Sequence, residues 1–214
     1  MRFEPKWSDR LSLASLAELE QRLKRVEPDG FGALSKDGTT VEPKTCGEWS
    51  SLHRHGFEPT TTIEEQPDGF ARFRCSTLAL LQHVRPARRS YVRGLLLDQG
   101  VLAVLPADVA SAWSREEVEA VAEASKLGKS LALFNPAARA STDPNTRNFE
   151  ITEVPGESSS AIVAVEAWGD FNGDGDDDVV ISIINLSGGS AQQFRLLVLT
   201  RAAPGNVLRV INSG

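Results

Sequence analysis

Residues 161–185 read AIVAVEAWGDFNGDGDDDVVISIIN, and this stretch decides the fold. Its two ends, 161–168 and 179–185, are runs of apolar and β-branched residues of the length that is typical of β-strands. Between them, after Gly169, the nine residues 170–178 include five acidic side chains and two glycines. The pattern predicts two strands joined by an acidic loop, and the residue types in that loop indicate a particular chemistry.

The spacing of the oxygen-bearing side chains in this loop favours calcium. Calcium takes roughly six to eight oxygen ligands, which have to converge from a tightly curved backbone. Side chains at alternate positions lie on the inside of such a curve, a later backbone carbonyl adds an oxygen, and a final carboxylate closes the shell. The expected ligands are Asp170, Asn172, Asp174, the backbone carbonyl of Asp176, and Asp178.

The other residues of the loop fit the same interpretation. Gly173 and Gly175 permit the positive φ angles that such a turn requires, and we expect the side chain of Asp177 to point to solvent. The simpler interpretation is an acidic, solvated hairpin turn that binds nothing. The regular spacing and the two glycines favour the metal site over that turn.

The loop begins like an EF-hand but departs from it at position twelve, where Ile181 replaces the closing glutamate. The flanks also differ, because an EF-hand needs helices on both sides. The segment WGDFNGDGDDDVVIS (168–182) instead resembles the calcium loop of FG-GAP and VCBS-type repeats, in which a D-x-[DN]-x-D-G-x-x-D loop joins neighbouring strands of an integrin-like β-propeller. The resemblance covers about residues 161–198 and implies the same five calcium ligands.

A propeller needs about four blades or more, and this chain has material for one. Further runs at 149–154, 194–200 and 207–211 extend the pattern to a five-stranded antiparallel meander, with breaks at 155–158, 187–190 and 204–205. The predicted fold class is α+β: a helical, loop-rich N-terminal part, 1–140, packed on the meander of 141–214 as one compact unit.

Helix signals stand at two places in the N-terminal part. Ser15 and Glu18 have the spacing of a capping box, and leucines follow at helical intervals up to Val26. Ser114 and Glu117 form a second such box, for a helix with Gly128 after its last turn.

Between these helices the pattern is weaker. Turns are expected at 36–38 and 67–69, a short helix around residues 48–52, and a strand at 70–75, where apolar and polar residues alternate. A helix capped by Ser76 or Thr77 would then end near Arg85, before Pro86. Residues 135–145 are expected to form a loop.

Cys46 and Cys75 are expected to form a disulfide, which would stabilise the fold by roughly 3 to 4 kcal/mol on the chain-entropy estimate. The alternative is two buried, unpaired thiols. A lone calcium loop suits extracellular calcium better than the cytosol. The sequence contains no apolar window long enough to span a membrane. Its start, MRFEPKWSDR, lacks a signal pattern, so we expect a periplasmic or extracellular protein whose signal lies outside this sequence, with a cytoplasmic location as the alternative.

The net charge of −6 comes largely from the acidic loop, since without its five acidic residues the balance would be −1. The remaining surface therefore offers no general field for nucleic acid, and we expect no nucleic-acid partner. One basic segment stands out, and it is a candidate site for an anionic partner or else a solvated face. Its arginines are Arg85, Arg88, Arg89 and Arg93.

Catalytic motifs are missing from the sequence, which contains no G-x-S-x-G, P-loop or G-x-G-x-x-G. His53 and His55 with the two cysteines lack the spacing of a zinc site. We therefore expect no catalytic residues and a non-enzymatic protein that binds calcium structurally and contacts another macromolecule, a protein or a cell-envelope glycan. The alternatives are a cell-envelope hydrolase with a cleft between the two parts, and an inhibitor or immunity protein of a secreted enzyme.

Overall fold

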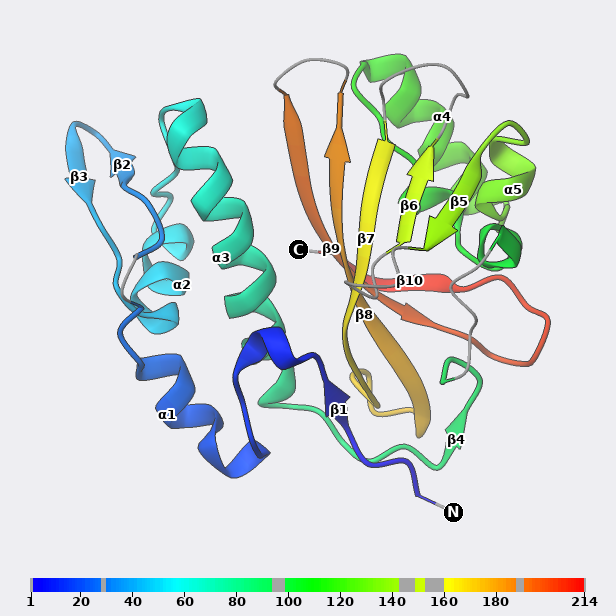
Figure 1. The fold of residues 1–214 in the computed structure, drawn as a ribbon, viewed down its shortest axis with the longest axis horizontal. Coiled ribbons are helices and arrows are strands. Elements are labelled where there is room, and N and C mark those ends of the chain that lie inside the picture. Colours follow the sequence, from blue (N-terminus) through cyan, green and yellow to red (C-terminus); the bar gives the residue numbers. More distant parts are fainter. Residues whose placement is uncertain are drawn as a thin grey trace.

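Six strands in the C-terminal part of the chain pair antiparallel in the order β10-β9-β8-β7-β6-β5 (Figure 1). A computed structural model describes residues 2–27, 30–93, 99–142, 149–152, 160–187 and 191–213. The strands are β5 (Arg139–Thr142), β6 (Phe149–Thr152), β7 (Ser160–Gly169), β8 (Asp176–Leu186), β9 (Gln192–Thr200) and β10 (Arg209–Ser213). The predicted α+β class and antiparallel meander are confirmed. β5 is an additional strand, and it lies in the segment 135–145 that was predicted to be a loop.

The central strand β8 explains why the sequence around the acidic loop is so apolar. Val179, Ile181 and Ile183 pack into a cluster on one face of the sheet, whereas Val180 and Ile184 belong to a cluster on the other face. A strand that is covered on both faces needs apolar residues at successive positions instead of alternate ones. β8 therefore lies in the middle of a layered structure, with helices on each side.

Two groups of helices form these layers. The first group contains η1 (Asp9–Leu11), η2 (Leu16–Glu18), α1 (Leu19–Lys24), α2 (Cys46–Arg54) and α3 (Thr62–Leu81), with the hairpin of β2 (Leu34–Lys36) and β3 (Thr39–Val41). The second group contains η3 (Gln99–Ala103), η4 (Ala107–Val109), α4 (Arg115–Lys126) and α5 (Leu131–Phe134). Two short strands, β1 (Lys6–Trp7) and β4 (Arg89–Ser90), extend the sheet by pairing with β7 and β8.

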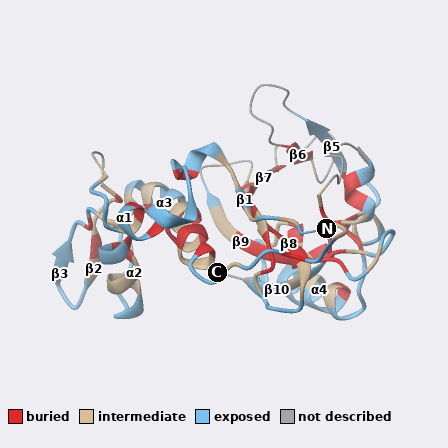
Figure 2. Cartoon of the chain, turned by 90° about the horizontal axis from the view of Figure 1, so that it is seen from below, coloured by how far each residue is buried: buried red, intermediate tan, exposed pale blue. Residues whose placement is uncertain are grey.

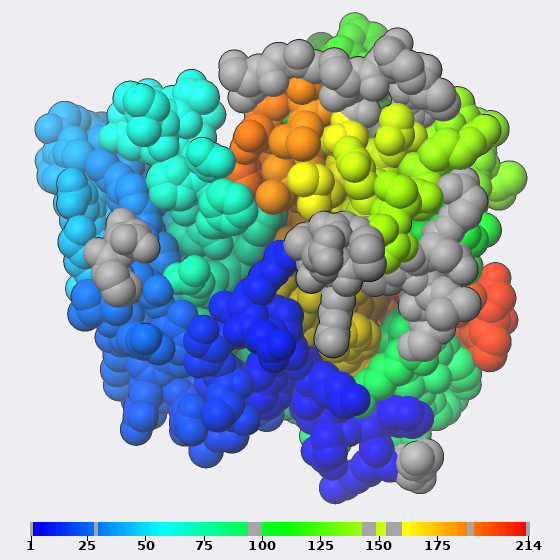
Figure 3. All heavy atoms as spheres, viewed as in Figure 1, coloured from blue at the N-terminus to red at the C-terminus, as the bar shows by residue number. Residues whose placement is uncertain are grey.

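Each helical group has its own core against the sheet. Leu78 and Leu81 of α3 pack with Val180 of β8 and Val198 of β9, and the α3 atoms lie beside those of β9 in Figure 3. On the opposite face, residues such as Leu131 of α5 join the cluster around β8. Figure 2 shows the buried residues concentrated in the strands between the two groups. The division at residue 140 stays a prediction, although η3, η4, α4 and α5 precede it and pack on the meander.

The strand predicted at 70–75 is wrong, because these residues lie inside the 20-residue helix α3. That helix starts much earlier than expected: Thr61 and Glu64 form a complete capping box, and Ser76 and Thr77 lie in its interior instead of capping it. The alternation of residues 70–75 covers less than two helical turns, so it also fits a helix with Ala71, Phe73 and Cys75 buried.

The turn predicted at Pro67-Asp68-Gly69 is wrong for a related reason. Pro67 lies inside α3, and Asp68 is buried and accepts hydrogen bonds from Trp49 and His53. A Cβ on Gly69 would lie 2.2 Å from the ring of Phe194 in β9. These turn-forming residue types therefore serve tertiary contacts, which local sequence rules do not register.

Of the two predicted capping boxes, one is present and the other is not. The Ser114 box is complete, and Gly128 follows α4 with a φ of 64°. Ser15 makes no capping hydrogen bond, the chain first forms η2, and α1 ends at Lys24, so Val26 lies outside the helix and is 62% exposed. The turns at 36–38 and 204–205 are present, whereas residues 155–158 and 188–190, as well as 28 and 29, lie outside the described ranges.

Candidate metal-binding loop

The acidic loop joins β7 to β8 at the edge of the two helical layers. Gly169 and Asp178 form the last pair of the β7–β8 ladder, so the chain between them makes the turn. Gly173 and Gly175 have φ angles of 84° and 87°, which confirms the prediction that glycine is needed at both positions. The backbone therefore has the tight curvature on which the calcium interpretation depends.

The side chains at alternate positions fold into the turn and accept hydrogen bonds from its backbone. The two carboxylate oxygens of Asp170 accept from the N–H groups of Gly173 at 2.6 Å and Gly175 at 2.9 Å. Asn172 accepts from the Asp174 N–H at 2.9 Å, and Asp174 accepts from the Asp176 N–H at 2.7 Å. The oxygens at these positions thus face the interior of the curve, where a cation would be coordinated.

Asp178 is the least satisfied acidic side chain of the loop. It is fully buried, its Oδ2 accepts from the Phe171 N–H at 3.0 Å, and its Oδ1 has no hydrogen-bond partner among the described residues. Burial and, to a smaller extent, the carboxylates of Asp174 and Asp170 raise the pKa of Asp178, whereas the Thr200 hydroxyl and the Phe171 N–H lower it, and the net result is a pKa of about 6. A buried oxygen without a donor, close to two other carboxylates, is the environment that a cation would stabilise.

The basic segment 85–93 lies directly against this loop. Arg85 and Asp170 exchange two backbone hydrogen bonds of 3.0 Å, and the Arg88 N–H donates to the Gly175 carbonyl at 2.8 Å. β4 then runs parallel to β8, with Arg89 opposite Asp176. Main-chain pairing therefore fixes the acidic loop to a segment that lies about 85 residues earlier in the sequence.

Two of the arginines in this segment neutralise carboxylates of the loop. Arg93 donates to Asp177 from Nε at 2.6 Å and from Nη2 at 3.1 Å, and the Ser90 hydroxyl adds a third bond. Arg89 donates to Asp176 at 2.7 Å. The expectation that Asp177 points to solvent is wrong, because Asp177 is only 1% exposed. The parallel pairing with β4 carries its side chain toward Arg93.

The four arginines therefore divide into two pairs. Arg89 and Arg93 are bound to Asp176 and Asp177, so the anion that they contact is part of the chain itself. Arg85 and Arg88 are exposed and lie beside Gly173 and Gly175. Their binding of an external anion stays a prediction.

The fit of the loop to calcium rests on its oxygens. Among the described residues no group of three or more His, Cys, Asp or Glu side chains is already arranged to hold a metal ion, because the carboxylates of the loop face backbone N–H groups. Carboxylate oxygens have spare lone pairs, and the unpartnered Oδ1 of Asp178 is a free ligand. Asp176 could contribute only its carbonyl oxygen, since Arg89 binds its carboxylate. The residues that could hold calcium are Asp170, Asn172, Asp174, Asp176 through its carbonyl, and Asp178.

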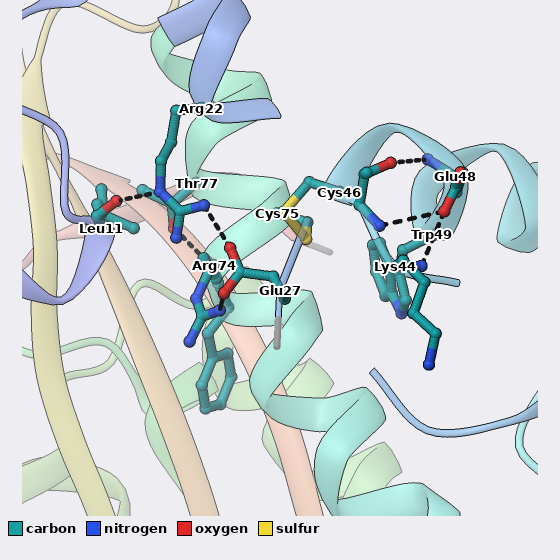
Figure 4. Close-up of a disulfide and its surroundings, with 12 residues drawn as sticks. Leu11, Arg22, Glu27, Lys44, Cys46, Glu48, Trp49, Arg74, Cys75 and Thr77 are labelled. Atoms are coloured by element: carbon teal, nitrogen blue, oxygen red, sulfur yellow. Dashed lines mark hydrogen bonds and ion pairs between the residues drawn. A yellow bond between two sulfur atoms is a disulfide. The ribbon is translucent and has the colours of Figure 1, made fainter. Parts of the chain in front are cut away.

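The predicted disulfide is present and joins α2 to α3 (Figure 4). The Cα atoms of Cys46 and Cys75 are 5.1 Å apart. Nearby, the partly buried carboxylate of Glu27 binds Arg22 of α1 and Arg74 of α3. A disulfide is compatible with an oxidising compartment. The described part of the chain contains no helix of the length and apolarity that a bilayer span requires.

The cysteines that a zinc site would need are joined in the disulfide, and His53 and His55 have other partners. His53 Nε2 lies 2.7 Å from the buried carboxylate of Asp68, its Nδ1 lies 3.6 Å from Glu58, and its ring packs on Trp49 with centroids 4.3 Å apart. His55 is exposed and bonds a backbone carbonyl of its own helix. This His53–Asp68 pair was not predicted, because Asp68 was assigned to a turn.

No protein-family model, curated protein or solved structure matches this chain. The geometry of the molecule is therefore the basis for inferring its function.

Proposed function

We propose that the loop of residues 170–178 binds one calcium ion, and that the protein is an exported, non-enzymatic interaction module in which this calcium is structural. The observation that carries the calcium proposal is the buried, unpartnered Oδ1 of Asp178 beside the carboxylates of Asp170 and Asp174. Arg89 and Arg93 of the adjoining segment do not compensate these three groups, because they bind Asp176 and Asp177. A cation supplies the missing charge.

A structural role follows from the position of the loop. It connects two strands, β7 and β8, that are largely buried, and it pairs with residues 85–90. A cation held there stabilises the point at which three segments of the chain meet. The likeness to FG-GAP repeats supports the same loop chemistry and, by analogy, a role in contacting a protein or cell-envelope glycan. Export to the periplasm or the extracellular space is supported by the disulfide.

One observation bears on the alternative of a hydrolase. His53 is bonded to the buried Asp68 and lines a cavity of about 560 Å³ that His83 also lines. In a catalytic pair one imidazole nitrogen contacts the carboxylate and the other is available to the nucleophile or substrate. Here both ring nitrogens of His53 face carboxylates, at 2.7 Å and 3.6 Å. This arrangement suits a positioned side chain better than a general base.

Thermal unfolding with and without calcium tests the proposal. Millimolar calcium is expected to raise the melting midpoint by several degrees relative to a chelator, since about 1 to 2 kcal/mol of binding free energy corresponds to roughly 2 to 8 °C for a chain of this size. Asp174→Ala is expected to abolish the increase. Asp37→Asn, an exposed position in the turn between β2 and β3, serves as the matched control and keeps the increase. A midpoint unchanged at millimolar calcium overturns the calcium site.

A further inference from the structure

A second candidate site lies on the face where α2 and the C-terminal half of α3 meet the strands β9 and β10. It is a cavity of about 560 Å³, which is within the usual size range of small-molecule sites. Its apolar floor includes Leu80 of α3 and Val198 of β9, with Phe171 of the acidic loop at one side. None of the motifs found in the sequence accounts for it.

The walls of this cavity are fixed by two features of the helices. Cys46 and Cys75 join α2 to α3, and the cavity-lining residues follow the cysteines at helical intervals of three and four: Trp49, Ser50, His53 and Arg54 on α2, and Ala79, Gln82 and His83 in and after α3. The buried carboxylate of Asp68 accepts from both the Trp49 indole and His53. The wall is therefore positioned in advance by the disulfide and by a buried acceptor.

The charge of the lining identifies the ligand class. Arg54 and His83 contribute a guanidinium and an imidazole to the lining, and the described lining contains no carboxylate. The imidazole of His53 also lines the cavity, but its two ring nitrogens face the carboxylates of Asp68 and Glu58. Within the described part of the chain the Arg54 side chain makes one bond, from Nε to the Ser50 carbonyl, which leaves its terminal nitrogens as donors for a ligand. A guanidinium in a lining without a described carboxylate favours an anionic ligand.

A second large groove differs from this cavity in the charges of its lining residues. A groove of about 620 Å³ between α3, α4 and the start of β9 is lined by the carboxylates of Glu65, Asp68 and Asp108 as well as by two arginines. Mixed charges of that kind favour no particular sign of ligand. The lining of the α2–α3 cavity instead combines apolar side chains with the hydrogen-bond donors of Arg54 and His83, and it contains no described carboxylate.

We infer that the cavity between α2, α3 and the β9–β10 edge binds a small organic anion, a carboxylate or sulfonate carried on an apolar body. The apolar body contacts Leu80, Val198 and Phe171, and the anionic group is bound by Arg54 and His83. The inference does not depend on the calcium proposal, because the anion-binding side chains come from α2 and from the residues after α3.

Binding of two matched probes tests this inference. 1-Naphthalenesulfonate and the neutral 1-naphthalenemethanol share one aromatic body and differ in charge. Titration calorimetry on the full chain is expected to give a Kd at least about tenfold lower for the sulfonate, since a hydrogen bond to a charged group contributes about 1.5 kcal/mol or more. In the ¹H–¹⁵N spectrum the shifts are expected at the Trp49 indole N–H and the Phe171 amide.

Variants test which side chains cause the tighter binding of the sulfonate. Arg54→Gln combined with His83→Gln is expected to reduce the sulfonate preference to less than about threefold; both side chains are exposed, so unchanged circular dichroism confirms an intact fold. Arg115→Gln, an exposed arginine at the start of α4, keeps the full preference. Failure of the sulfonate to bind, equal affinity for both probes, retention of the preference in the double variant, or shifts confined to other residues overturns the inference.

Discussion

At Asp178, burial and the carboxylates of Asp170 and Asp174 all oppose ionisation, and they raise its pKa from 3.8 to about 6. In the metal-free protein the folded state therefore binds more protons than the unfolded state between these two values. The contribution of Asp178 to stability is therefore greatest below about pH 4, falls as the pH rises to about 6 and is constant above it, with a change of about 3 kcal/mol at most from this one group. At the proposed site calcium is expected to reverse this dependence, because it would bind the ionised form.

Asp178→Asn separates these two effects. Without calcium the variant is expected to be at least as stable as the original chain at pH 7 and to lack the decrease between pH 4 and 6. With calcium it gains no stability, since the closing carboxylate is missing. Urea unfolding at several pH values, with chelator and with calcium, measures both. A variant that still responds fully to calcium would contradict the role of Asp178 as a ligand.

Asp177 and Asp176 are adjacent in sequence, but their carboxylates pair with arginines that differ in burial. Asp177→Asn leaves the largely buried Arg93 without its partner and is expected to cost about 3 kcal/mol. Asp176→Asn affects a pair with Arg89, whose side chain is 61% exposed, and is expected to cost less than about 1 kcal/mol. The free energy of unfolding, compared between the two variants in chelator, checks the difference. Equal costs would contradict it.

Single-residue patterns could identify the loop but not its partners. Alternating oxygens and two glycines predicted the turn, its positive φ angles and the expected ligands from local sequence alone. The solvent-facing orientation of Asp177 was wrong because its partner, Arg93, lies 84 positions away. The acidic loop and the basic segment were each recognised, whereas their contact depends on the parallel pairing of β4 with β8, which no local signal encodes.

Among the structural elements, α3 was the least predictable. Its sequence contains Pro67 and Gly69, which are typical of turns, followed by an alternation that is typical of a strand. The Thr61 and Glu64 capping box was the signal that could have located its start. The strands around the loop were easier, because runs of β-branched residues between turns have few other structures available to them.

The glycine at position 69 provides a test of how α3 packs on the sheet. Gly69→Ala places a Cβ 2.2 Å from the Phe194 ring and is expected to destabilise the fold by about 1 to 3 kcal/mol despite the higher helix propensity of alanine. Gly47→Ala in α2 meets only contacts of 3.8 Å and is expected to be neutral or stabilising by up to about 1 kcal/mol. Denaturant unfolding of both variants checks this. A stabilising Gly69→Ala would contradict the close packing.

The disulfide between α2 and α3 closes a loop with a sequence separation of 29 residues. Replacing both cysteines by serine is expected to cost about 3 to 4 kcal/mol, mainly because the unfolded chain gains conformational freedom. Chemical unfolding of the double variant, compared with the oxidised chain, measures the cost. Thiol titration of the denatured, unreduced protein should detect no free cysteine, and two free thiols would contradict the bond.

At the scale of the whole molecule, the sheet is covered on both faces by helical groups. Apolar runs in β8 indicated burial but could not show that residues 99–134 would supply the second layer, since the signals in that segment are short. The polar groups between the layers are equally non-local: Glu166 of β7 accepts from Ser8 near the N-terminus and from Ser182 of β8. The fold class was predictable from local pattern, whereas the layering depends on contacts between distant segments.

Phe171 belongs both to the acidic loop and to the wall of the α2–α3 cavity: its N–H binds Asp178, and its side chain faces the cavity. If each of the two proposed ligands changes the position of Phe171, their binding is thermodynamically linked. If calcium changes the affinity for an organic anion by some factor, the anion must change the affinity for calcium by the same factor. The loop would then act as a reporter of cavity occupancy, and calcium titrations with and without 1-naphthalenesulfonate would give the sign and size of that coupling.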